Sequence, residues 1–181
     1  MYAVVALLDD TTDRRVRALW DALNALLGGD TLTQRNPVPH FSLHVAESYR
    51  MDQMLPSLRR FTRLETALDV QTAGLGLFSA EEITLYATVV RATALYRFHV
   101  AAIAAVEGYA IGPDERYLPE HWVPHITLAQ ARAGAHARVA AAVEHLLGED
   151  LVWQITVREL ALITGGAGAA PAVIERFPLG G

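Results

Sequence analysis

The sequence predicts an α+β fold built from two related halves that share one groove. Strand-like and helix-like hydrophobic patterns alternate along its 181 residues without a long linker. Two short segments are also nearly the same, PHFSL at 39–43 and PHITL at 124–128. They begin 85 residues apart (124 − 39), which is close to half of the chain. We therefore expect a single domain over 1–181, with one lobe at about 1–80 and a second at about 81–181.

The first half has the pattern strand, helix, strand, helix, strand. An apolar run at 4–8 predicts a buried strand. The stretch after it, up to Leu27, has apolar residues at helical spacing, polar residues at 10–12 that can cap its start, and glycines at 28–29 that can end it. The remaining elements of this half are expected to be a strand at about 40–46, a helix at 51–64 and a strand at 69–78.

The second half repeats this order. A β-rich strand at 83–90 precedes a helix at 93–109, and a long loop at 112–124 leads into the second motif strand at 125–130. The elements expected after that strand are a helix at 135–147, a strand at 151–163, a small-residue hairpin loop at 165–171 and a short strand at 173–177. Each motif strand thus follows one helix and precedes another.

Composition limits the classes of function. Fifteen basic and twenty acidic residues give a formal charge of −5, which argues against binding long duplex nucleic acid through many phosphate contacts. The absence of cysteine excludes disulfides, thiolate zinc sites and a cysteine nucleophile. The first eight residues lack a basic start and are too short for a membrane span. We expect a cytoplasmic protein, a monomer, without a membrane partner.

Each repeated segment places a histidine two residues before a hydroxyl. Because side chains alternate between the two faces of a strand, His40 and Ser42 should share one face, and His125 and Thr127 should do the same. A pair of imidazoles can supply a base and an acid together near neutral pH, and hydroxyls can stabilise negative charge that grows in a transition state. This chemistry requires neither a metal nor another cofactor, and we expect neither.

These motifs resemble the signature of the 2H phosphoesterase superfamily, which comprises the 2′-5′ RNA ligase-like and cyclic phosphodiesterase-like proteins. The signature is a pair of His-φ-Ser/Thr-φ motifs in which φ is apolar, here HFSL at 40–43 and HITL at 125–128. Trp122, Val123 and Pro124 lead into the second motif as in many relatives. The resemblance covers nearly the whole chain. It implies a bilobal, pseudo-twofold fold with two antiparallel sheets flanking a central cleft and helices outside.

The resemblance also implies the class of reaction. We expect a metal-independent phosphoesterase that hydrolyses a small cyclic phosphodiester, such as a 2′,3′-cyclic nucleotide or RNA end, or a 2′-5′ phosphodiester. His40 and His125 would be the acid and base, in either order. The alternatives are a nucleotide or RNA-end binding protein without turnover and a 2′-5′ RNA ligase. RNA ligase-like relatives often carry Arg where this chain has Gln130, which weakens the ligase interpretation.

Five further residues are candidates for binding the substrate. His44 lies four residues after His40 and should share its strand face. Arg35 and Arg132 flank the two motifs and can contribute positive charge for phosphate. Tyr86 and Tyr117 can contact a base, Tyr86 from the strand at 83–90 and Tyr117 from the long loop. Phe78 is a weaker candidate of the same kind.

Other histidines and Trp122 are expected to have structural or solvent-exposed positions. His99, His136 and His145 fall in predicted helices among alanines and charged residues, which indicates solvated faces. Trp122 is expected to pack beneath the long loop. A metal site would have to recruit His121 together with the histidines at 40, 44 and 125, and no carboxylate accompanies them at a familiar spacing.

Overall fold

The computed structural model describes residues 1–28, 32, 36–132, 134–165 and 170–180. Its helices are α1 (Asp10–Leu27), α3 (Met51–Leu64), α4 (Thr93–Val106) and α5 (His136–Leu147), with two 3₁₀ turns at Glu107–Tyr109 and Glu115–Tyr117. Its strands are β1 (Tyr2–Leu7), β2 (His40–Tyr49), β3 (Leu68–Phe78), β4 (Glu82–Val89), β5 (Ala110–Pro113), β6 (His125–Arg132), β7 (Gln154–Val157), β8 (Glu159–Thr164) and β9 (Ala172–Pro178).

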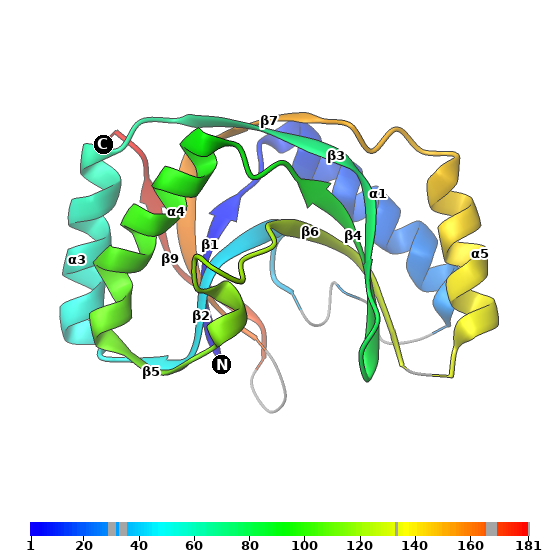
Figure 1. Ribbon diagram of the computed structural model, residues 1–181, viewed down its shortest axis with the longest axis horizontal. Helices are drawn as coiled ribbons and strands as arrows, with labels where there is room; N and C mark the ends of the chain where they lie inside the picture. The colour runs from blue at the N-terminus through cyan, green and yellow to red at the C-terminus, as the bar shows by residue number, and fades with distance from the viewer. Residues whose placement is uncertain (29–31, 33–35, 133, 166–169, 181) are drawn as a thin grey trace.

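All of the strand pairs are antiparallel, in the order β7-β3-β4-β6-β2-β1-β8-β9, with β5 on the edge of β2. The two motif strands, β2 and β6, meet in the middle through one pair, Phe41 and Ile126. That pair divides the strands into a half-sheet of β7, β3, β4 and β6 and a half-sheet of β2, β1, β8 and β9 (Figure 1). The predicted bilobal, antiparallel α+β fold is therefore confirmed.

The two half-sheets do not follow the order of the chain. β3 joins β4 and β7, whereas β8 and β9 complete the half-sheet that β1 and β2 begin. Each half-sheet is also covered by helices from both halves of the chain. Helix α1 packs on β6 and against α5, and α4 packs on β2 and against α3. Figure 1 shows these two helix pairs at opposite ends of the molecule. A boundary near residue 80 therefore does not separate the two halves of the sheet.

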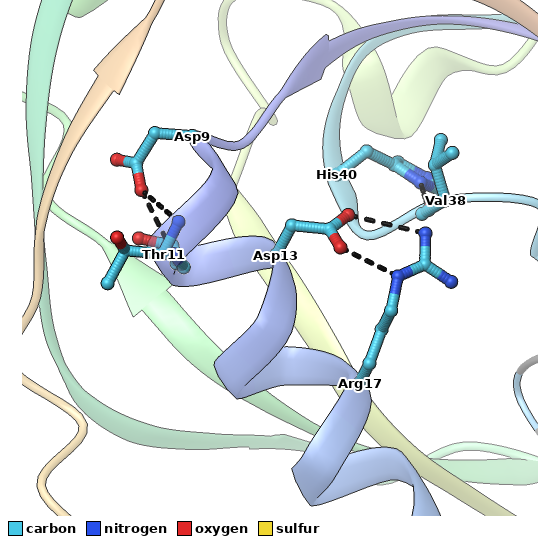
Figure 2. Close-up of polar contacts among 7 residues, drawn as sticks. Asp9, Thr11, Asp13, Arg17, Val38 and His40 are labelled. Atoms are coloured by element: carbon cyan, nitrogen blue, oxygen red, sulfur yellow. Dashed lines mark hydrogen bonds and ion pairs between the residues drawn. The ribbon is translucent and has the colours of Figure 1, made fainter.

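The ends of α1 illustrate how the sequence defines an element. Asp9 is the N-cap, and its carboxylate accepts hydrogen bonds from the backbone N–H groups of Thr11 and Thr12 at 3.1 and 2.9 Å (Figure 2). Gly28 ends the helix in the left-handed conformation, with a φ of 63°. The cap therefore lies one residue before the polar run at 10–12.

Two segments differ from the expected strand boundaries. The strand expected at 151–163 is split into β7 and β8, which pair with β3 and β1 in different half-sheets. Arg158 lies between them, where the chain crosses from one half-sheet to the other. Residues 110–113, which follow the helix expected at 93–109 and include the first residues of the loop expected at 112–124, form the edge strand β5. Both differences depend on pairing with strands far away in the sequence.

One face of the motif strands is buried by the helices. Phe41, Leu43, Ile126 and Leu128 are at most 1% exposed and belong to one core cluster together with Trp20 of α1. The residues between them, beginning with the two histidines, lie on the opposite face. None of the helices in the described ranges is both long enough and apolar enough to cross a bilayer.

Candidate active site

A cleft of about 1470 Å³ lies on the face of the sheet opposite the helices. His40 and Ser42 of β2 and His125 and Thr127 of β6 line it together. The hairpin between β3 and β4 and the 3₁₀ turn at Glu115–Tyr117 form other parts of its wall. Two motifs that are half a chain apart thus meet because β2 and β6 are neighbours in the sheet.

The two histidines are held by the same local contact. Nδ1 of His40 is 2.8 Å from the carbonyl oxygen of Val38 (Figure 2), and Nδ1 of His125 is 2.7 Å from that of Val123. A carbonyl only accepts hydrogen bonds, so Nδ1 carries the proton in both rings. Nε2 is then the nitrogen that each ring offers to a substrate. It accepts a proton in the neutral form and donates one in the charged form.

The environment favours the neutral form of both imidazoles. Burial lowers the pKa of His40 to about 4, against an opposing contribution from its hydrogen bond to Val38, and the nearby His125 lowers it further. Burial also lowers the pKa of His125, and Arg116 adds to this effect while the hydrogen bond to Val123 opposes it. The two rings therefore lie close enough for the charge on one to influence the other.

The cleft face of each motif strand is set by a β-bulge. In the β1–β2 ladder, Val4 pairs with His44 and Val5 with Ser42, which leaves Leu43 as the extra residue. In the β4–β6 ladder, Leu85 pairs with Ala129 and Tyr86 with Thr127, so Leu128 is the extra residue. The last apolar residue of each motif is thus the bulged one. No residue type in the two motifs signals these bulges in the sequence.

The bulge in β2 explains why the expectation for His44 was wrong. Strand alternation predicts that His44 lies beside His40, but the extra residue Leu43 reverses the alternation, and Val45 lines the cleft instead. His44 is 1% exposed and contacts the hydroxyl of Tyr49 at 2.6 Å through Nδ1. Its pKa is lowered to about 4, mainly by burial. His44 is therefore part of the interior behind the site.

Two aromatic residues on the β3–β4 hairpin contact His125. Phe78 lines the cleft and meets the His125 ring edge to face at 5.0 Å between centroids. Tyr86 is 5.2 Å from His125 and 4.3 Å from Phe78, is 8% exposed, and is not among the described residues that line the cleft. Its ring lies over Gly76, where a Cβ atom would come within 2.2 Å of it. Tyr86 therefore contacts His125 and Phe78 without lining the cleft itself, and the weaker candidate Phe78 is the aromatic residue of this pair that lines it.

The long loop contributes Tyr117 and Trp122, as expected from sequence, and also Arg116, which no sequence motif indicates. Tyr117 lines the cleft, and burial raises the pKa of its hydroxyl above the usual value, although Arg116 and a hydrogen bond with Ser42 act in the opposite direction. Trp122 is buried beneath the loop, as predicted, at 2% exposed. Arg116 also lines the cleft and is bound by Asp114, with the closest N···O distance at 2.6 Å. Its position next to Tyr117 in the loop was the available signal.

The structure describes one of the two arginines that were expected to bind phosphate. Arg132 is exposed at the end of β6 and is not among the described residues that line the cleft. Arg35 lies outside the described residues. Among the lining residues that the structure describes, Arg116 is the one arginine, and it belongs to the 3₁₀ turn at Glu115–Tyr117.

His99 also differs from the expectation of a solvated helix face. It is fully buried on α4, stacks on Trp122 with 3.6 Å between centroids and 9° between planes, and its Nε2 contacts the carbonyl of Leu43 at 2.9 Å. The neighbouring alanines do not expose it, because α4 packs this face onto β2. His121 lines the cleft, and within the described ranges no three histidine, aspartate or glutamate side chains gather as metal ligands.

Solved structures with the same fold come from bacteria and yeast. TT0787 of Thermus thermophilus is 18% identical, with a TM-score of 0.59 over 99% of this chain and 98% of that one. E. coli LigT complexed with 3′-AMP is 11% identical, with a TM-score of 0.57 over 98% and 96%. Kluyveromyces marxianus Usb1 with uridine monophosphate is 13% identical, with a TM-score of 0.55 over 98% and 97%.

The family itself is shown at the level of sequence. Comparison with curated proteins finds no match. A family model described as the 2′-5′ RNA ligase superfamily matches residues 8–169, a range that contains both motifs and most of the described elements. The chain belongs to the 2′-5′ RNA ligase superfamily of 2H phosphoesterases.

Proposed function

We propose that this protein is a metal-independent phosphoesterase that hydrolyses a small cyclic phosphodiester, a 2′,3′-cyclic nucleotide or RNA end, or a 2′-5′ phosphodiester. The observation that carries the proposal is the matched pair of imidazoles. His40 and His125 each use Nδ1 to bind the carbonyl two residues earlier and line one cleft from adjacent strands. Members of the superfamily are phosphoesterases and ligases, which supports an enzymatic role.

The reaction needs two proton transfers on opposite sides of phosphorus. A neutral imidazole accepts a proton from water as the water oxygen forms a bond to phosphorus. The other imidazole, in its protonated form, donates a proton to the sugar oxygen as the P–O bond to that oxygen breaks. The phosphate charge of a bound substrate favours the protonated form of the acid, whose pKa in the free protein is lowered by burial. Either histidine can serve as the base.

The two motif hydroxyls face the same space as the imidazoles. Ser42 and Thr127 line the cleft at equivalent positions of the two strands. We assign them to the non-bridging oxygens of the phosphodiester, where a hydroxyl donor stabilises the charge that grows in the transition state. Loss of one such donor typically costs roughly 10²–10³ in rate.

The charge of the cleft supports a small substrate. Arg116 is the arginine among its described lining residues, and Glu81 and Glu82 line it at the β3–β4 hairpin. A long polyanion requires many phosphate contacts, which this lining does not offer. Two similar proteins have structures with nucleotides, LigT with 3′-AMP and Usb1 with uridine monophosphate, which supports a nucleotide or RNA end as the substrate here. Phe78 and Tyr117 are the aromatic residues we assign to the base.

The first experiment measures hydrolysis of the four nucleoside 2′,3′-cyclic monophosphates in the presence of EDTA. Wild type is compared with His40→Asn and His125→Asn, and with His136→Asn as a control on the exposed face of α5. The product is identified as the 2′- or 3′-phosphate. We expect turnover that survives the chelator, is lost in both cleft variants and is retained in the control.

Other results would change the proposal. Turnover that requires a divalent metal would contradict the two-histidine mechanism. Binding of the nucleotides without hydrolysis would support the alternative of a nucleotide-binding protein. Hydrolysis of 2′-5′-linked oligonucleotides together with their formation in the reverse direction would favour 2′-5′ RNA ligation.

A further inference from the structure

Two tryptophans bind the backbone of the two motifs in matching ways. The indole Nε1–H of Trp122 donates to the carbonyl of Ser42, and that of Trp20 donates to the carbonyl of Thr127, both at 2.9 Å. Both indoles are 2% exposed. Each tryptophan belongs to a segment remote from the motif it binds: Trp122 precedes β6 and binds β2, while Trp20 belongs to α1 and binds β6.

The carbonyls that accept these hydrogen bonds stand at the two bulges. Ser42 and Thr127 immediately precede the extra residues Leu43 and Leu128. A bulge disrupts the ladder locally and leaves the extra residue unpaired. A buried carbonyl without a donor is costly, so an indole N–H at this point stabilises the bulged backbone in one conformation.

The bulged backbone also decides which side chains face the cleft. The strands β2 and β6 share only the pair Phe41 and Ile126, so the ladder between them offers little restraint on either side of it. We propose that Trp20 and Trp122 are positioning residues, whose indole N–H groups hold the two bulges so that the motif histidines and hydroxyls converge on one substrate. The proposal rests on the proposed function above, because it assigns the convergence a role in turnover.

The contacts around Trp122 support this role. Its ring is stacked nearly parallel on His99, which also reaches the carbonyl of Leu43, the bulged residue itself. Two consecutive carbonyls of the first motif, those of Ser42 and Leu43, therefore bind side chains from α4 and the loop before β6. These interactions restrain the bulge through two side chains, Trp122 and His99, that are not among the described residues lining the cleft.

The test replaces each tryptophan by phenylalanine, which keeps an aromatic ring and removes the N–H donor. Trp153 supplies the matched control, since it is the third tryptophan of the chain, is 3% exposed, and donates its indole N–H to the carbonyl of Asp150 at 2.6 Å, outside both motifs. Turnover of a 2′,3′-cyclic nucleotide is measured at a temperature where urea unfolding shows each variant to be fully folded. Backbone amide hydrogen exchange of the free protein is measured in parallel.

We expect Trp20→Phe and Trp122→Phe to lower kcat by about tenfold or more, because misplacing reacting groups by about 1 Å can cost about 100-fold. KM should change little, and the pH profile of kcat/KM should shift as the imidazoles move. Amide exchange should accelerate locally, at 126–129 for Trp20→Phe and at 41–44 for Trp122→Phe. Trp153→Phe should lose comparable stability without these changes.

The two proposals fail in different ways. An unchanged kcat and pH profile in both Trp20→Phe and Trp122→Phe would overturn the positioning role. An equal loss of kcat in Trp153→Phe would do the same, and either result would leave the proposed phosphoesterase activity standing. If wild type does not turn over any of the substrates, the proposed function fails, and amide exchange still decides the inference: uniform exchange across the variants would show that the indoles do not hold the bulges.

Discussion

Acid should destabilise this protein through its buried histidines, and His99 allows the effect to be calculated. Its ring is fully buried, and burial is the main cause that lowers its pKa from 6.5 to about 4, with His44 and Arg91 contributing and hydrogen bonding opposing. Between pH 6.5 and 4 the unfolded chain takes up a proton that the folded protein does not. The contribution of neutral His99 to the free energy of unfolding is therefore fully present above pH 6.5, and it is lost as the pH falls toward 4.

The magnitude follows from the two pKa values. The full difference of about 2.5 pH units (6.5 − 4) corresponds to about 3 kcal/mol at roughly 1.4 kcal/mol for each unit. Between pH 7 and 5 the same two values give a loss of about 2 kcal/mol in the free energy of unfolding from His99 alone. His44 is 1% exposed, has a pKa lowered to about 4, and adds a loss in the same direction.

Urea unfolding at pH 7 and pH 5 measures this loss directly. His99→Phe keeps an aromatic ring against Trp122 and removes the titrating group. Its free energy of unfolding should therefore fall by about 2 kcal/mol less than that of wild type between these two pH values. The His99→Phe variant should be less stable than wild type already at pH 7, because the carbonyl of Leu43 loses its hydrogen bond with the imidazole. His136→Asn, on the exposed face of α5, should behave as wild type. Equal losses for wild type and His99→Phe would refute the reasoning.

Three further substitutions test separate parts of the structure. Ser42→Ala should lower kcat by roughly 10²–10³ while the urea midpoint changes little, and a change confined to KM would argue against a transition-state role. Gly76→Ala should destabilise the protein and reduce turnover, because the new Cβ would lie 2.2 Å from the Tyr86 ring, which contacts His125; thermal unfolding and kinetics together check this, and an unchanged Tm would contradict it. Asp9→Ala should cost about 1 kcal/mol in urea unfolding through loss of the α1 cap, whereas Asp9→Ser should restore most of it.

Sequence reasoning located the elements that depend on local patterns. The helix predicted at 51–64 has those bounds in the structure, and Gly28 ends α1 as expected. The two motif strands begin at His40 and His125, as predicted. Their hydrophobic period and flanking residues are properties of short segments, and these are the features that propensity and spacing describe.

The predicted positions of side chains are wrong where those positions depend on contacts with segments remote in the sequence. His44 was placed on the cleft face by strand alternation, which the bulge at Leu43 reverses. The alanines and charged residues around His99 predict a solvated helix face, yet α4 packs onto β2 and buries this histidine. Arg116 was missed because its position depends on a 3₁₀ turn and on Asp114 rather than on a motif.

The sequence by itself determined the chemistry available to this protein: two imidazoles, two hydroxyls, and the apolar period that turns each pair toward one face of a strand. Tertiary structure alone decided that β2 and β6 are neighbours, that each motif ends in a bulge, and that a tryptophan binds the carbonyl beside each bulge. The physical reason is that strand pairing, register and backbone hydrogen bonds join segments tens of residues apart, and no local pattern specifies which partners they take.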